Sequence, residues 1–268
     1  MNGTKIKLIG ELPKLNNPIF IEGLPGVGNV GRIAVGYLLE ELKAKKFAEL
    51  ISSHFMPFVL IHQSSAVHVL KNEFYYWKSK DQKQRDIVFL IGDSQSVDTT
   101  GHYEIVETIL DFLEKLGVKD IITTAGLSVQ TKEKKDRLIG AVSSPDVIKK
   151  YEKIGIDFDT GSKVGTIIGA SGLLLGLGRY RDMNGLCLLG ETSGMPEIPD
   201  PKTAEIILKV LVKILNVKID MSELQVKIKE MEKFMSKIQK VQSKALSQML
   251  AEEMGKGTGD KEDLKYIG

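Results

Sequence analysis

The segment from Gly92 to His102 carries residue types from which a catalytic site could be built. Its reactive side chains are those of Asp93, Ser94, Asp98 and His102. They follow an apolar run typical of a central strand, and ligands of open α/β sheets bind beyond the carboxyl ends of strands. A serine near a histidine could act as a nucleophile with its base. Because these residues also suit a turn and a helix N-cap, and no Gly-x-Ser-x-Gly surrounds Ser94, we expect a structural loop without catalytic residues.

A glycine-rich turn, Gly26-Val-Gly-Asn-Val-Gly31, matches the G-x-G-x-x-G pattern between a strand and a helix. Helix N-termini bind phosphate, so the turn could hold a nucleotide. The ribose-binding acid expected about twenty residues later is missing, because Ile51 occupies that place. The Lys-Ser/Thr ending of a P-loop is also missing, because Arg32 follows Gly31. We interpret Gly26, Gly28 and Gly31 as structural glycines and expect no cofactor. The alternative function is a nucleotide- or nucleoside-processing enzyme that uses this turn and the 92–102 loop.

Cysteine and histidine give no sign of a metal site. Cys187 is the only cysteine, which excludes an intrachain disulfide and a cysteine-rich zinc site. It lies in an apolar run, where a buried, unreactive thiol is expected. The histidines lack the spacing of metal ligands; they are His54, His62, His68 and His102. We therefore expect no bound metal.

Composition narrows the class of protein and its partners. The chain has 268 residues, of which 42 % are apolar and 27 % charged, which is ordinary for a globular protein. Its net charge is only +2 and its basic residues are scattered, which argues against nucleic acid as the main partner. The most apolar segment, 165–178, is too short to cross a bilayer. We expect a cytoplasmic protein without a membrane partner.

The elements that position these motifs alternate between strand and helix patterns up to about residue 220. Strands are expected at 18–21, 50–51, 55–62, 66–70, 73–78, 86–91, 121–124, 138–142 and 186–189. Helices are expected after Gly31 and at 102–116, 145–154, 165–180 and 201–215. The strands at 66–70 and 73–78 are expected to pair as a hairpin around Lys71-Asn72. Residues 1–220 are thus predicted to form one α/β core domain, a mostly parallel sheet flanked by helices.

Residues 221–254 are predicted to form a long C-terminal amphipathic helix, because Ser222 can cap it and neither proline nor glycine follows until Gly255. Its apolar positions follow coiled-coil spacing, with one polar interruption: Leu224, Ile228, Met231, Met235, Ile238, Gln242, Ala245 and Met249. We expect this seam to contact other chains; the alternative is a helix folded back on its own core. Residues 255–268 are expected to be a flexible tail.

Five segments in sequence order carry a family resemblance. They are Ile19-Phe-Ile-Glu-Gly-Leu-Pro-Gly-Val-Gly-Asn-Val-Gly31, Val88-Phe-Leu-Ile-Gly-Asp-Ser-Gln95, Thr123-Thr-Ala-Gly-Leu127, Gly169-Ala-Ser-Gly-Leu-Leu-Leu-Gly176 and Gly190-Glu-Thr-Ser-Gly194. The resemblance that they carry covers residues from about 18 to 217. In these segments the chain resembles the proteasome-assembly-chaperone family in its archaeal branch.

The resemblance implies a fold like that of the phosphorylase and peptidyl-hydrolase α/β proteins, without an established active site. It also implies symmetric homo-oligomers that bind the core proteasome and assist its assembly or activation. Members that act on assembled particles end in a hydrophobic–Tyr–any tripeptide, which enters pockets between α-subunits. Here Tyr266 is third from the end, followed by Ile267 and Gly268, so the register departs from that pattern. We expect these three residues to contact the proteasome.

Overall fold

The computed structural model describes residues 3–61, 65–129, 136–159, 165–193, 198–226 and 228–229. The chain divides into two compact units, Met1–Met221 and Ser222–Gly268. In the second unit, Leu224 and Ile228 lie in helical backbone. The predicted tail and the other residues of the predicted seam lie outside the described part; the named ones are Met231, Met235, Ile238, Gln242, Ala245, Met249, Tyr266, Ile267 and Gly268.

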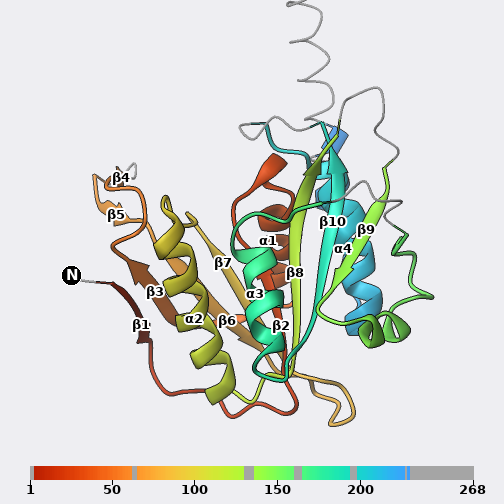
Figure 1. Cartoon of the computed structure of the whole chain (residues 1–268), viewed down its shortest axis with the longest axis horizontal. Coiled ribbons are helices and arrows are strands. Elements are labelled where there is room, and N and C mark those ends of the chain that lie inside the picture. Colours follow the sequence, from red (N-terminus) through yellow and green to blue (C-terminus); the bar gives the residue numbers. More distant parts are fainter. Residues whose placement is uncertain are drawn as a thin grey trace, which may run out of the picture. The chain divides into compact units, whose positions relative to one another are not determined.

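An eight-stranded sheet forms the centre of the first unit, with the order β1-β3-β6-β7-β2-β8-β10-β9 (Figure 1). The strands are β1 (Thr4–Leu8), β2 (Ile19–Gly23), β3 (Lys45–Ser52), β6 (Asn72–Trp77), β7 (Ile87–Gly92), β8 (Asp120–Ser128), β9 (Leu138–Val142) and β10 (Asn184–Thr192). The four central strands, β7, β2, β8 and β10, run parallel, and the flanking pairs are antiparallel. The predicted α/β class is confirmed, and the sheet is mixed.

Helices cover both faces of this sheet. They are α1 (Val30–Glu41), α2 (Thr99–Lys115), α3 (Ala170–Arg179) and α4 (Pro201–Leu215), with short 3-10 turns at Val27–Asn29 and Pro145–Lys150. Helices α1 and α4 pack together on one face, and α2 and α3 on the other (Figure 1). Every residue of β2 is buried, as expected for a central strand covered on both sides. The carboxyl ends of the parallel strands therefore converge on one edge of a rigid layer.

The small hairpin formed by β4 (Val59–Ile61) and β5 (Val67–Val69) stands apart from the main sheet. Strand β5 pairs with β4, whereas β6 pairs with β3 and β7. The predicted hairpin around Lys71-Asn72 is therefore wrong. Asn72 is fully buried at the start of β6, so the chain passes at this point from the hairpin into the sheet instead of reversing. The edge strand β1 was not predicted.

Candidate functional site

The glycine-rich turn and the 92–102 loop lie together at the carboxyl ends of the parallel strands β2, β7, β8 and β10. The glycine-rich turn follows β2, and the 92–102 loop follows β7. Helix α3 begins beside them, because its first backbone amide, that of Ala170, donates a hydrogen bond to Gln95 Oε1 at 2.9 Å. This edge is where an open α/β sheet places a ligand. We call residues 22–31, residues 92–102 and the start of α3 the strand-end cluster.

Glu22 is the fully buried carboxyl group of the strand-end cluster. Its Oε1 accepts the backbone N–H of Leu24 at 2.8 Å, and its Oε2 accepts the Ser171 hydroxyl at 3.0 Å. Burial raises the pKa of Glu22 from 4.5 to about 7, against the lowering effect of these hydrogen bonds. The group is therefore only partly ionised at neutral pH, and it ties β2 to α3. The sequence analysis did not predict Glu22 as a site residue. The pattern that could have indicated it is a single acid in an otherwise apolar strand.

The glycine-rich turn is closely packed against β8. At Gly31, an added Cβ would lie 2.5 Å from Thr124 Oγ1 and 2.6 Å from the Thr124 carbonyl oxygen. Gly28 has a φ of +64°, and its carbonyl oxygen accepts the backbone N–H of Asp200 at 2.8 Å. Gly26 faces open space, where a Cβ would meet nothing within 4 Å. The close approach of α1 to the sheet thus depends on Gly31, and the backbone conformation of the turn favours glycine at Gly28.

The polar side chains of the 92–102 loop make structural contacts. Asp93 Oδ2 lies 2.6 Å from His68 Nε2 and accepts the backbone N–H of Lys71 at 3.2 Å. Ser94 donates its hydroxyl to the Gln95 carbonyl oxygen at 2.7 Å. Asp98 caps α2 by accepting the N–H of Gly101 at 2.7 Å. Asp93, Ser94 and Asp98 thus hold turns and a helix end, and His102 lies near the start of α2.

Gln95 joins the glycine-rich turn to α3. Its Nε2 donates to the Pro25 carbonyl oxygen at 2.7 Å, while its Oε1 accepts the Ala170 amide. Gly169, with a φ of +90°, lies so close that an added Cβ would be 2.5 Å from Gln95 Oε1. A first-turn amide of α3, of the kind that could bind phosphate, is therefore bonded to a side chain of the same fold.

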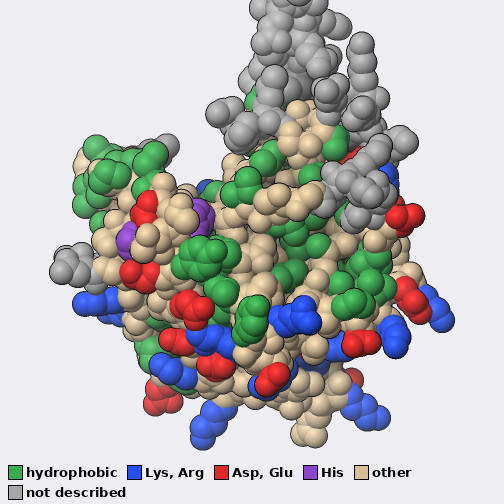
Figure 2. All heavy atoms as spheres, in the orientation of Figure 1, with side chains coloured by type: hydrophobic (Ala, Val, Ile, Leu, Met, Phe, Trp, Pro, Cys, Tyr) green, Lys and Arg blue, Asp and Glu red, His purple; other side chains and the backbone are tan. Residues whose placement is uncertain are grey.

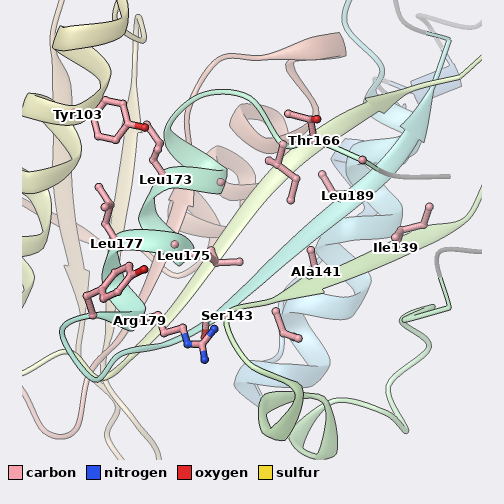
Figure 3. Close-up of a pocket in the computed structure, with 16 residues that line it drawn as sticks. Tyr103, Ile139, Ala141, Ser143, Thr166, Leu173, Leu175, Leu177, Arg179 and Leu189 are labelled. Atoms are coloured by element: carbon pink, nitrogen blue, oxygen red, sulfur yellow. The ribbon is translucent and has the colours of Figure 1, made fainter. Parts of the chain in front are cut away.

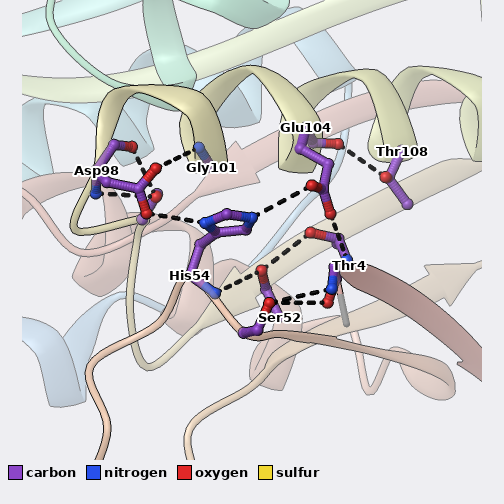
Figure 4. Close-up of polar contacts among 10 residues, drawn as sticks. Thr4, Ser52, His54, Asp98, Gly101, Glu104 and Thr108 are labelled. Atoms are coloured by element: carbon purple, nitrogen blue, oxygen red, sulfur yellow. Dashed lines mark hydrogen bonds and ion pairs between the residues drawn. The ribbon is translucent and has the colours of Figure 1, made fainter. Parts of the chain in front are cut away.

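His54 lies between two carboxylates beside the start of α2 (Figure 4). Its Nδ1 is 2.8 Å from Asp98 Oδ2, and its Nε2 is 3.2 Å from Glu104 Oε2. These carboxylates, Asp98 above all, raise the pKa of His54. Glu104 also accepts the backbone N–H of Thr4. The cluster fastens the segment between β3 and β4 to α2 and to the edge strand β1.

The cysteine and the possible metal ligands remain to be placed in the structure. Cys187 is fully buried, and burial raises the pKa of its thiol to about 12, so the reactive thiolate is disfavoured. Among the described residues, no group of three or more His, Cys, Asp or Glu side chains could hold a metal ion. Likewise, within that part of the chain no helix has the length and apolar character needed to cross a membrane.

Comparison with known proteins identifies related chains over nearly the whole length. The family model described as the PAC2 family matches residues 20–239. An uncharacterized protein of Methanocaldococcus jannaschii, MJ1210, is 32 % identical over 260 residues, which cover 97 % of this chain and 96 % of that protein.

Two solved structures from Pyrococcus furiosus are similar in fold and sequence. PbaB, described as an archaeal proteasome activator, is 43 % identical with a TM-score of 0.83, covering 89 % of this chain and 100 % of its own. PbaA, described as an archaeal homolog of proteasome-assembly chaperone, is 28 % identical with a TM-score of 0.71, covering 93 % of this chain and 98 % of its own.

Proposed function

This chain belongs to the PAC2 family, and from that premise we propose that it is a non-catalytic, self-assembling cytoplasmic chaperone that binds core proteasomes and assists their assembly or activation. The resemblance to archaeal proteasome-assembly chaperones, drawn from the glycine-containing segments, is confirmed at the level of the family. The single observation that carries the proposal is the similarity to PbaB, a protein described as a proteasome activator, over most of the chain.

The strand-end cluster supports a role without catalysis. Glu22, Asp93 and Asp98 each accept hydrogen bonds from the backbone of the fold. Ser94 directs its hydroxyl to a neighbouring carbonyl oxygen. These hydrogen bonds hold strands, turns and helix ends together, which accounts for the three carboxyl groups without a catalytic role. Family membership and the internal use of these side chains thus favour binding as the protein's work.

Docking through the C-terminal residues is the finer part of the proposal. Tyr266, Ile267 and Gly268 contact the α-subunits of the core particle, and the seam of the terminal helix contacts other chains. A short tail that binds alone contributes roughly 4 to 6 kcal/mol, which corresponds to high-micromolar to millimolar affinity. Several tails on one assembly gain on the order of a hundred-fold through effective concentration. The protein therefore needs self-assembly to bind well.

Removal of residues 265–268 tests the tail. We expect at least a ten-fold weaker affinity for purified core particles, measured by surface plasmon resonance with the particles immobilised. Lys265→Ala is the matched control and retains the affinity, because it leaves the last three residues in place. An unchanged affinity after the deletion would rule out these residues as the docking site.

A further inference from the structure

The hairpin formed by β4 and β5 exposes apolar side chains on both of its faces. Ile61 is 75 % exposed and Val67 is 67 % exposed. The other large exposed apolar residues of this segment are Met56, Phe58, Val59, Leu60 and Val69. They form the apolar patch at the upper left of Figure 2, over the hairpin that Figure 1 shows standing apart from the sheet. We call residues 56–61 and 65–69 the apolar knob.

The apolar knob lacks the features that keep an exposed strand edge soluble. Its described residues include no Lys, Arg, Asp or Glu. Strands β4 and β5 hydrogen-bond only to each other within the described sheet pairings. Natural proteins usually protect such edges with charges or cover them with another element. Contiguous exposed apolar surface of this kind marks a protein-binding site.

The base of the apolar knob is held in place by ionisable contacts on both sides. Before β4, His54 lies between Asp98 and Glu104 of α2. Within β5, His68 Nε2 lies 2.6 Å from Asp93 Oδ2, in the loop after β7. These contacts hold the base of the apolar knob against α2 and against the loop after β7. An anchored base lowers the entropic cost of association.

An open groove of about 630 Å³ lies beside α3 (Figure 3). Its lining is mainly apolar and comes from α3, β9, β10 and the first turns of α2, including Leu173, Leu177, Ala141 and Tyr103. Tyr180, also in the lining, is 88 % exposed. Cavities of roughly 300 to 1,000 Å³ hold whole small ligands, so this groove has room for several large side chains.

The apolar knob and the groove lie near opposite edges of the sheet. The knob emerges between β3 and β6, whereas the groove is lined by β9 and β10 at the other end of the strand order. A chain therefore offers its knob to one neighbour and its groove to another. Such a head-to-tail contact closes into a ring when the rotation between copies permits.

We propose that the apolar knob of one copy inserts into the α3 groove of the next copy, and that this contact builds the assembly. The inference rests on the self-assembly in the proposed function and names the surfaces that make it. A second copy is favoured as occupant because both surfaces belong to the same unit of this chain. It also matches the absence of charge in the knob, since buried interface cores are depleted in charged residues.

Two single substitutions test the contact from its two sides. Ile61→Asp places a charge on the knob at an exposed position. Gly176→Leu fills the groove from an exposed turn of α3, where an added Cβ meets nothing within 4 Å. Each variant is expected to weaken self-association at least a hundred-fold, measured by sedimentation velocity of the full chain. Matched controls are Val97→Asp, at another exposed valine, and Gly36→Leu, at another unobstructed helical glycine in α1; both should assemble like the unmodified chain.

Mixing the two variants decides the geometry of the contact. Ile61→Asp retains a working groove and Gly176→Leu retains a working knob, so an equimolar mixture should form a heterodimer while each alone stays monomeric. The inference is overturned if the unmodified chain is monomeric, if either variant assembles normally, or if the mixture stays monomeric. If both variants assemble normally and still bind core particles, the knob–groove contact is ruled out and the proposed function stands. If assembly depends on the knob and the groove but the unmodified assembly does not bind core particles, the contact stands and the proposed function is contradicted.

Discussion

The strand-end cluster and the apolar knob differ in how completely the fold uses their side chains. In the cluster, Glu22 and Gln95 are bonded to partners from neighbouring elements. In the knob, Ile61 and Val67 have most of their surface in water. Glu22 and Gln95 thus bond to other parts of the fold, whereas the knob leaves apolar side chains exposed to water. The difference favours the proposal that this chain binds partners through its surface and does not transform a substrate.

Glu22→Gln gives the largest effect expected in the cluster. Because burial raises the pKa of Glu22 from 4.5 to about 7, folding disfavours its charged form, and stability falls as pH rises from 4.5 to 7. At about 1.4 kcal/mol per pH unit, this costs roughly 3 kcal/mol at pH 8. Urea unfolding at pH 8 should show the variant more stable by up to that amount, and nearly equal to the unmodified chain at pH 4.5. A variant less stable at both pH values would show that the carboxyl is needed for its hydrogen bonds.

Gly31→Ala tests the close packing of the glycine-rich turn. The added Cβ would meet Thr124, including its backbone carbonyl oxygen, so overpacking should lower the free energy of unfolding by about 2 kcal/mol. Gly36→Ala, in the same helix with no atom within 4 Å, is the control and should raise stability by roughly 0.5 to 1 kcal/mol. Chemical denaturation measures both changes. Equal stability of the two variants would show that α1 does not approach β8 closely at Gly31.

His54→Gln has the smallest expected effect and probes the junction between the two regions. Asp98 and Glu104 raise the pKa of His54, so its contribution to stability is complete below the ordinary pKa of histidine. That contribution is lost as pH rises through the raised pKa in the folded protein. The Tm difference between the unmodified chain and the variant should therefore be larger at pH 5.5 than at pH 8.5. A difference independent of pH would mean that the imidazole acts only through packing.

Local patterns predicted those parts of the fold that local interactions determine. Helix α4 begins at Pro201 and ends at Leu215 as predicted, because proline suits a first turn and an apolar face repeats along the helix. The edge strand β1 was missed although its side chains alternate between polar and apolar from Lys5 to Leu8, because the segment is only five residues long and mostly exposed. Pairing of β5 was predicted wrongly, since strand order is set by contacts distant in sequence: β6 pairs with β3 and β7, and β5 pairs with β4.

The candidate site also has parts that local sequence patterns predicted and parts that they could not predict. The sequence located the glycine-rich turn and the 92–102 loop, because both follow strongly apolar strands. It could not place His54 beside Asp98 or Glu22 beside Ser171, because these partners are 44 and 149 residues apart in sequence and meet only through the strand order. The groove beside α3 is likewise a product of topology, since its walls come from separate helices and strands.

Native mass spectrometry of the full chain mixed with core particles tests the central claim most directly. If binding arises from several weak contacts acting together, the spectra should show core particles carrying several copies of the chain. The monomeric Ile61→Asp variant should show almost no complex at the same concentration. Core particles that bind single copies of the monomeric variant as tightly as the assembled chain would contradict the claim.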